Sequence, residues 1–314
     1  MTIDGSPVSA EGLDALPPRE IARRAESLGE AKANLPTLDL LVLGGLAGAF
    51  IAMGAMFATT VLAGSSSLPY GVARLLAGLV FCLGLILVVI AGAELFTGNN
   101  LIVMAWASRR VHTLRLLYVW AVVYIGNFVG SIAAAALVYA AKQYTFGHGA
   151  VGAAALTIAA TKTSLGFGQA VALGMLCNAL VCIAVWLTYG ARSVTDKILA
   201  IVFPITAFVA AGFEHSVANM YFVPYGLFVK GDSGFVASAE GLPSLAHLTW
   251  GRFFVDNLVP VTIGNVLGGT LMVGAVYWLV YLRPRRGESA QPARRAMSGE
   301  STSASVGRPS SRTS

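Results

Sequence analysis

Three ionisable side chains stand within or at the end of long apolar runs of the sequence. Glu94 ends one run, and Glu214 and His215 interrupt another. Ionisable residues at such positions in membrane segments are rare and mark functional sites. His215 is the candidate for proton chemistry, because histidine gains or loses a proton near neutral pH. The two glutamates are interpreted as residues that hold loops in place by pairing with backbone N–H groups.

The sequence around each glutamate occurs twice. The stretches AGAELFTGNN (91–100) and AGFEHSVANM (211–220) share Ala-Gly-x-Glu and, after four further residues, Asn. A second pair, IGNFVG (125–130) and IGNVLG (263–268), follows in the same order. These matches divide the chain into two halves of three spans, and an odd number of spans makes the halves oppositely oriented in a membrane. The sequence therefore predicts an inverted repeat, as in many channels and transporters.

We expect both glutamate motifs to break their helices, because the glycines beside them allow the backbone to leave the helical path. Thr97 and Ser216 are the predicted caps where the helices restart. In an inverted arrangement the two restarted half-helices point their N-termini, which carry partial positive charge, toward the membrane midplane. That centre favours a small anion. Asn178, alone in an apolar run, is expected either to hydrogen-bond His215 or to join helices.

The elements that must position these groups are membrane-spanning helices. The chain is 56% hydrophobic and 11% charged, whereas soluble domains carry about 25% charged residues, so a water-soluble fold is excluded. Six spans are expected at about 40–63, 75–93, 116–141, 165–188, 198–229 and 253–282. Between the third and fourth expected spans, a looser stretch that contains Gly, Ala and Thr reaches Ser164. The predicted fold is an all-α membrane protein with six transmembrane helices in two inverted repeats, the second and fifth helices broken.

The predicted domains are a cytoplasmic segment with an amphipathic helix (1–36), a channel domain (37–284) and a disordered cytoplasmic tail (285–314). Most of the 21 Lys and Arg residues lie in the first and last of these and in two of the loops. The positive-inside rule then places both termini in the cytoplasm and explains the net charge of +6 without nucleic acid. Three separated cysteines give neither a disulfide framework nor a metal site. We predict no metal, no cofactor and no enzyme activity.

Six stretches carry a resemblance to a known family. They are GAELFTGNN (92–100), YIGNFVGS (124–131), LGMLCNALVC (173–182), GARSVTDK (190–197), GFEHSVANM (212–220) and VTIGNVLGG (261–269). With these motifs the chain resembles the formate/nitrite transporter family over about residues 20–285. The resemblance implies an aquaporin-like fold with one pore in each protomer of a pentamer, although the Asn-Pro-Ala motif of aquaporins does not occur here.

The resemblance also implies roles for single residues. His215 matches the central pore histidine, Thr97 the threonine of the loop in the second span, and Asn178 a pore-side asparagine. Lys162 matches a basic residue of the outer vestibule. The loop-organising residues are Glu94, Glu214, Asn99 and Asn219. Two apolar constrictions or their surroundings are implied at Phe81, Leu85, Leu95, Phe96, Val181 and Phe208, for which the residues alone favour ordinary core packing.

The implied function is passage of a weak-acid anion, coupled to protons through His215. Lys162 and the half-helix dipoles draw the anion in, apolar constrictions oppose a bare charge, and the acid crosses in its neutral form. Formate is favoured because the loop at 190–197 and the stretches at 223–230 and 253–265 look more like those of formate channels than those of nitrite channels. Nitrite and hydrosulfide are the alternatives. The expected partners are the small anion, protons, the lipid bilayer of the cell inner membrane and the other copies of a homopentamer. A different class of function is a membrane scaffold that docks a cytoplasmic formate-metabolising enzyme at the N-terminal helix.

Overall fold

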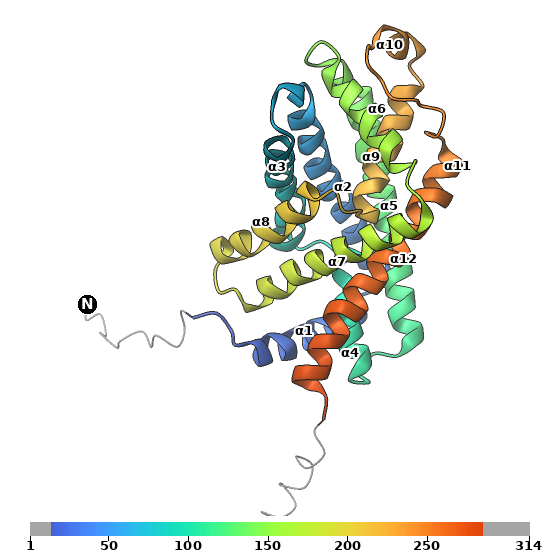
Figure 1. Cartoon of the computed structure of the whole chain (residues 1–314). Helices are drawn as coiled ribbons and strands as arrows, with labels where there is room; N and C mark the ends of the chain where they lie inside the picture. Colours follow the sequence, from blue (N-terminus) through green and yellow to red (C-terminus); the bar gives the residue numbers. More distant parts are fainter. Residues whose placement is uncertain (1–13, 285–314) are drawn as a thin grey trace, which may run out of the picture. The chain divides into compact units, whose positions relative to one another are not determined.

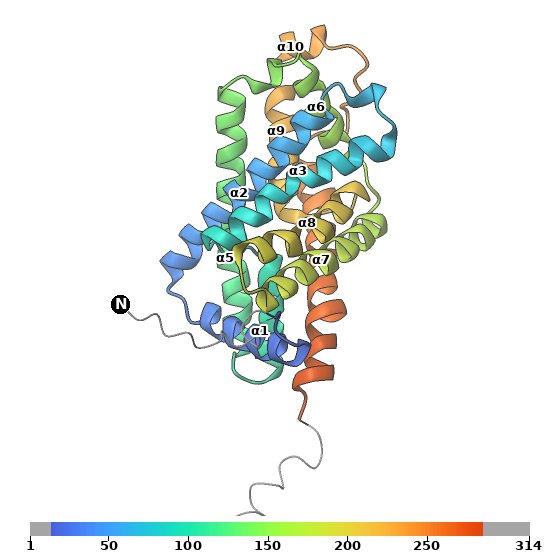
Figure 2. The ribbon, with the colours of Figure 1, turned by 90° about the vertical axis from the view of Figure 1, so that its left-hand side faces the viewer.

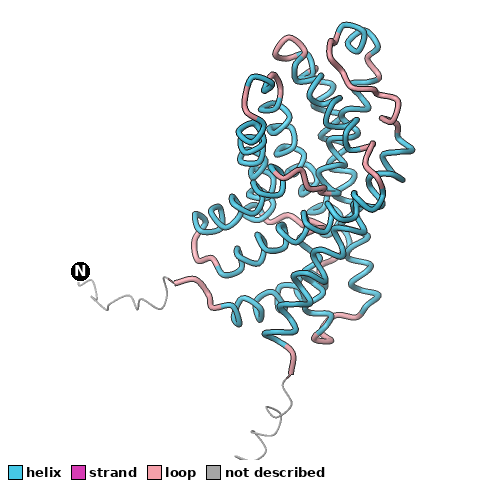
Figure 3. The backbone as a smooth tube through the Cα atoms, viewed as in Figure 1, coloured by secondary structure: helices cyan, strands magenta, loops and turns pink. Residues whose placement is uncertain are grey.

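The computed structural model describes residues 14–284, and every regular element among them is a helix (Figures 1 and 3). Five helices are long and apolar enough to cross a membrane: α2 (Thr37–Leu62), α3 (Tyr70–Ala91), α5 (Thr113–Ala140), α7 (Phe167–Gly190) and the helix Trp250–Leu282. The last contains α11 (Trp250–Arg252), η5 (Phe253–Leu258), α12 (Val259–Leu267), η6 (Gly268–Ala275) and η7 (Trp278–Leu282). At about 1.5 Å per residue even the shortest covers the roughly 30 Å apolar layer of a bilayer. The predicted all-α membrane fold is confirmed.

The remaining span is built from two shorter helices that meet at a break. These are α8 (Val194–Ala210) and α9 (Ser216–Lys230). Between them Gly212 has a φ of 77°, a left-handed conformation that glycine adopts without steric cost. Gly92 has a φ of 80° and ends α3 in the same way, after which the chain restarts as η3 (Gly98–Ile102) and α4 (Val103–Ala107). Both predicted breaks are confirmed, and Figure 3 shows them as loops inside the bundle.

A further helix precedes the first span of each half. α1 (Pro18–Ala33) comes before α2, and α6 (Ala150–Lys162) comes before α7. α1 packs against η3 and α4, whereas α6 packs against α9, so each contacts the restarted part of its own broken span. Figures 1 and 2 show α1 at one end of the bundle and α6, with α10 (Ser233–Ser238), at the other. This placement is the one that an inverted repeat requires. Two short turns, η2 (Ser65–Ser67) and η4 (Gln143–Thr145), follow α2 and α5.

One connecting segment is more regular than the sequence predicts. The stretch that reaches Ser164 was expected to be loose, but it contains the regular helix α6. Its Ala, Gly and Thr residues give little contrast between an apolar and a polar face, so periodicity does not reveal it. The predicted disordered tail, 285–314, lies outside the described residues, as do residues 1–13.

Glycine lets the long helices approach closely at equivalent points in the two halves. α2 packs on α5, and α7 packs on α12. A Cβ atom placed on Gly130 would overlap the carbonyl oxygen of Gly45, and one on Gly268 would overlap that of Met175. Gly130 and Gly268 are the last residues of the two IGNxxG motifs. The repeated motif therefore encodes a close helix crossing.

We expect Gly130→Ala to destabilise the protein by about 1–3 kcal/mol, because the added methyl group must push two backbones apart. Thermal unfolding of the detergent-solubilised protein measures the loss. Gly71→Ala is the matched control, since a Cβ at Gly71 meets nothing within 4 Å. Equal melting temperatures for Gly130→Ala and the unmodified protein would contradict the close crossing.

Candidate functional site

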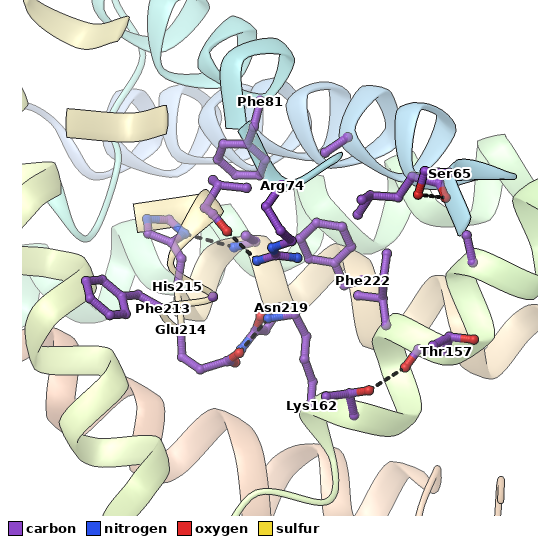
Figure 4. Close-up of a pocket in the computed structure, with 18 of the residues that line it drawn as sticks. Ser65, Arg74, Phe81, Thr157, Lys162, Phe213, Glu214, His215, Asn219 and Phe222 are labelled. Atoms are coloured by element: carbon purple, nitrogen blue, oxygen red, sulfur yellow. Dashed lines mark hydrogen bonds and ion pairs between the residues drawn. The ribbon is translucent and has the colours of Figure 1, made fainter. Parts of the chain in front are cut away.

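Two cavities approach the breaks from opposite ends of the bundle. The α6-side cavity, of about 680 Å³, reaches the break between α8 and α9 (Figure 4). Its lining includes Phe81, Lys162, Phe208, His215 and Phe222. The α1-side cavity, of about 230 Å³, reaches the break after α3 and is lined by residues that include Lys32, Leu85, Glu94, Leu95 and Val185. The side chains between the two cavities form the candidate barrier of a pore.

Apolar side chains stand at the inner ends of both cavities. On the α6 side, Phe81 and Phe208 meet edge to face with ring centroids 5.6 Å apart, and both are almost fully buried. On the α1 side, Leu85 lies one turn along α3 from Phe81 and lines the cavity together with Leu95. An apolar region of this kind opposes the passage of an unaccompanied charge.

The other two residues that the family resemblance assigns to the constrictions line neither cavity. Phe96 packs edge to face on Tyr124, with ring centroids 4.8 Å apart, and also contacts Trp120. Val181 is 1% exposed and belongs to the apolar core. Phe96 belongs to the loop of the first break, and neither residue faces open space.

The imidazole of His215 connects the two breaks. Its Nδ1 accepts the backbone N–H of Ala218 at 3.0 Å, and its Nε2 lies 2.9 Å from the hydroxyl oxygen of Thr97 in the other half. Because Nδ1 is an acceptor, the single proton of the neutral ring is on Nε2, which donates to the Thr97 hydroxyl. The ring is 3% exposed, and its centroid lies 5.8 Å from that of Phe208. The structure thus brings the predicted histidine and threonine into direct contact.

One of the two predicted helix caps is wrong. His215, rather than Ser216, occupies the N-cap position of α9, and its ring makes the capping hydrogen bond. Thr97 occupies the N-cap position of η3 as predicted, but its side chain makes no capping hydrogen bond, because the hydroxyl lies against His215. Serine is the better cap by intrinsic preference, and a contact between the two halves overrides that preference.

Each loop glutamate forms an ion pair with a lysine from the helix that precedes its half. Glu94 Oε1 lies 2.9 Å from the Nζ of Lys32, near the end of α1. Glu214 Oε1 lies 2.7 Å from the Nζ of Lys162, at the end of α6. The expected pairing of these carboxylates with backbone N–H groups is therefore wrong. Lys162 does line the α6-side cavity, but its charge is balanced there. Sequence reasoning missed Lys32, whose equivalence to Lys162 appears only once α6 is known to be a helix.

Asparagines complete both loops. Asn99 and Asn219 donate to the carboxylates of their own loops at 2.7 Å. Asn127 and Asn265, the asparagines of the IGN motifs, hold the loops from the neighbouring spans. Each donates to the main-chain oxygen of its loop's glutamate and accepts the N–H two residues further on, all at 2.9 Å. The sequence showed the repeated motif but not this role of its asparagine.

Asn178 joins three elements in the centre of the protein. Its amide nitrogen lies 2.7 Å from the side-chain oxygen of Asn100, 2.7 Å from the carbonyl oxygen of Asn265 and 3.3 Å from that of Thr97. It therefore fixes the first break to α7 and α12. The direct hydrogen bond to His215 that the sequence suggested gives way to these contacts, and Asn178 reaches the histidine only through Thr97.

A helical membrane bundle whose two broken spans meet at a titratable side chain, with a cavity on either side, defines a membrane channel or transporter for small solutes. The profile of the family described as formate/nitrite transporter matches residues 19–279. The chain belongs to the formate/nitrite transporter family, and the resemblance drawn from the sequence motifs is confirmed.

Similar proteins span nearly the same length. The formate channel FocA of Escherichia coli strain K12 is 41% identical over 274 residues, which cover 86% of this chain and 96% of that protein. An uncharacterized transporter of Bacillus subtilis, YrhG, is 39% identical over 277 residues, 86% and 95% of the two chains. A solved structure described as a pentameric formate channel with formate bound superimposes with a TM-score of 0.71 at 41% identity, covering 79% of this chain and 98% of the other.

Proposed function

We propose that the protein is a formate channel that works as a homopentamer in the cell inner membrane, with both termini in the cytoplasm. The observation that carries the proposal is the contact between His215 and Thr97, made where two half-helices meet between apolar layers. Proteins named formate channels are among the relatives at 40% identity or more, and a similar solved structure is a pentamer that holds formate. The proposal orients the α6-side cavity toward the outside and the α1-side cavity toward the cytoplasm, because most Lys and Arg of the loops and termini then face inward.

In this mechanism the anion enters a cavity, loses its water at the apolar layer and meets the Nε2–H of His215. An oxygen of the anion takes the place of the Thr97 hydroxyl as the acceptor of that hydrogen bond. A carboxylic acid with a pKa of about 3.5–4 in water is more easily protonated in a dry site, because low polarity disfavours the charged form. The acid then crosses the second apolar layer without charge.

The contacts of His215 determine how a proton can pass through the ring. In the capped geometry the ring carries one proton, on Nε2, while Nδ1 is engaged by Ala218. When Nε2 transfers its proton to the anion, Nδ1 must break its hydrogen bond with the Ala218 N–H and take a proton from water, so that the ring stays neutral. We propose this relay, proton in at Nδ1 and proton out at Nε2, as the coupling step. Asn178 serves it indirectly by fixing Thr97.

A competition experiment tests the choice of substrate. We expect unlabelled formate to inhibit uptake of radiolabelled formate into proteoliposomes at lower concentration than nitrite, hydrosulfide or lactate, and uptake to rise as the outer pH falls from 7 to 5. The rise follows because a lower pH supplies the co-transported proton. Stronger competition by nitrite or hydrosulfide would assign the channel to that anion instead.

The scaffold alternative concerns α1. This helix buries Ile21, Ala22 and Ala25 against its own channel and leaves Arg19 and Arg23 exposed, so a charged face remains for a cytoplasmic formate-metabolising enzyme. We propose such docking as an addition to transport and not as a replacement. A protein that acted only as a scaffold would give no formate flux in proteoliposomes.

A further inference from the structure

Besides Lys162, a second cation lines the α6-side cavity. Arg74, in the first turns of α3, contributes to this lining, and Figure 4 shows its guanidinium turned into the cavity. Lys162 is balanced by Glu214 at 2.7 Å. Among residues 14–284, no carboxylate lies within ion-pair distance of Arg74. Of the charged residues in the lining, Arg74 thus supplies the net positive charge of the cavity.

The hydrogen bonds of Arg74 leave one edge of its guanidinium available. Nε donates to the carbonyl oxygen of Ala210 at 3.2 Å, and Nη2 donates to that of Val209. These bonds occupy the edge formed by Nε and one hydrogen of Nη2. A guanidinium has five N–H donors, and the end formed by Nη1 and the second hydrogen of Nη2 has no protein acceptor in the described part of the chain. Two parallel N–H groups of this kind match the two oxygens of a carboxylate.

The same contacts improve the cavity for an anion. Val209 and Ala210 end α8 at the break, and the carbonyl groups at a helix C-terminus carry partial negative charge. Arg74 covers two of them. The N-terminus of α9, with partial positive charge, lies across the same break. Arg74 therefore offsets the negative charge at the end of α8, while the positive N-terminus of α9 still faces the break.

Among residues 14–284, the lining of the α1-side cavity has no equivalent of Arg74. The charged residues of its described lining are Lys32 and Glu94, which pair with each other at 2.9 Å. No side-chain donor to the last carbonyls of α3 is found within residues 14–284. The two halves repeat their lysine–glutamate pairs, but in the lining that the structure describes only the α6-side cavity has an additional cation.

We propose that Arg74 forms an anion subsite in the α6-side cavity that selects planar anions with two oxygens, such as formate and other small carboxylates, over a single-centre anion such as hydrosulfide. The subsite rests on the proposed function, since it is where an anion from that side first binds. It makes the two faces of the channel unequal: the half-saturation concentration for formate is lower from the α6 side than from the α1 side.

The test compares the full-length protein with Arg74→Gln and Arg74→Lys in proteoliposomes whose orientation is sorted by accessibility of a C-terminal tag. We expect Arg74→Gln to raise the half-saturation concentration for formate from the α6 side about tenfold or more, because a charge-assisted pair of hydrogen bonds is lost. Arg74→Lys keeps the charge but loses the two parallel N–H donors, so it gives an intermediate half-saturation concentration. Hydrosulfide from the α6 side loses the attraction of the charge but no paired hydrogen bonds, so its half-saturation concentration rises less than that of formate. Formate from the α1 side changes by less than about twofold.

Arg252→Gln is the matched control. It removes an arginine that is 44% exposed and pairs with Asp256 within its own helix, and it leaves both half-saturation values unchanged. If Arg74 only stabilises the end of α8, its replacement lowers the melting temperature, or lowers maximal flux equally for every anion and in both directions, without a selective effect on formate from the α6 side. That result overturns the subsite. Should Arg74→Gln fail to fold, Arg74→Lys decides through the ratio of its half-saturation concentrations for formate and hydrosulfide. A ratio above that of the unmodified protein supports the subsite, and an unchanged ratio contradicts it.

A second readout separates the subsite from the proposed function. Formate raises the melting temperature of the purified protein if it binds, and this shift is expected to shrink in Arg74→Gln. Absence of formate flux in the unmodified protein, with the shift still dependent on Arg74, contradicts only the transport proposal. If formate flux is normal and neither the half-saturation concentrations nor the thermal shifts depend on Arg74, only the subsite is contradicted.

Discussion

Replacing His215 by asparagine is expected to abolish proton-coupled formate uptake while leaving the protein folded. Asparagine is a good N-cap residue, so its side-chain oxygen can accept the Ala218 N–H that the imidazole accepts now. It has no titratable nitrogen, so the relay between Nδ1 and Nε2 is lost. Positioned proton transfer typically contributes about 100-fold or more to a rate, and we expect proton-coupled flux to fall by at least that factor. Radiolabelled formate uptake and an internal pH-sensitive dye measure the two fluxes together.

His215→Phe separates the two roles of the ring. Phenylalanine lacks both the proton and the cap, and loss of an N-cap costs about 1 kcal/mol. We expect the same loss of coupling as in His215→Asn, together with a lower melting temperature. If His215→Asn transports formate with protons at the unmodified rate, the imidazole is not the coupling group. If only His215→Phe fails, the ring acts as a cap alone.

The sequence was sufficient to predict the spans and their breaks. Runs of 20 or more apolar residues leave few alternatives to a membrane helix, and the predicted limits lie within a few residues of α2, α3, α5 and α7. Glu94 and Glu214 marked the breaks because a carboxylate within an apolar run must leave the lipid. The inverted repeat followed from the order of two short motifs.

The contacts at the breaks could not be predicted in the same way. Lys32 and Glu94 are 62 residues apart, and Lys162 and Glu214 are 52 apart, so no local pattern joins them. α6 was missed because its small residues show no clear face. Propensity scales favour Ser216 as a cap because they describe isolated helices, whereas the cap in the structure, His215, is held by Thr97 from the other half. Arg74 is a single basic residue at a helix start until the fold places the end of α8 beside it.

Glu214→Gln is expected to be strongly destabilising. The change keeps the size of the side chain and an oxygen that can accept from Asn219, but it leaves the Lys162 ammonium without its carboxylate. The Lys162 side chain is 14% exposed, and breaking a buried ion pair by removing one partner costs about 3–5 kcal/mol. Thermal unfolding in detergent measures the loss as a lower melting temperature.

Two further variants show whether charge is the cause. Lys162→Met combined with Glu214→Gln removes both charges and is expected to recover most of the stability, because neutral groups of similar volume carry no such desolvation cost.

Glu94→Gln breaks the corresponding pair in the other half, where Lys32 is 26% exposed. Since water can solvate that ammonium better, we expect a smaller loss. Equal losses at Glu94 and Glu214, or no recovery in the double variant, would mean that packing of the loops rather than the buried charge decides their stability. Equivalent contacts in the two halves need not contribute equal free energies, because the energy of an ion pair depends on how far each cavity admits water to it.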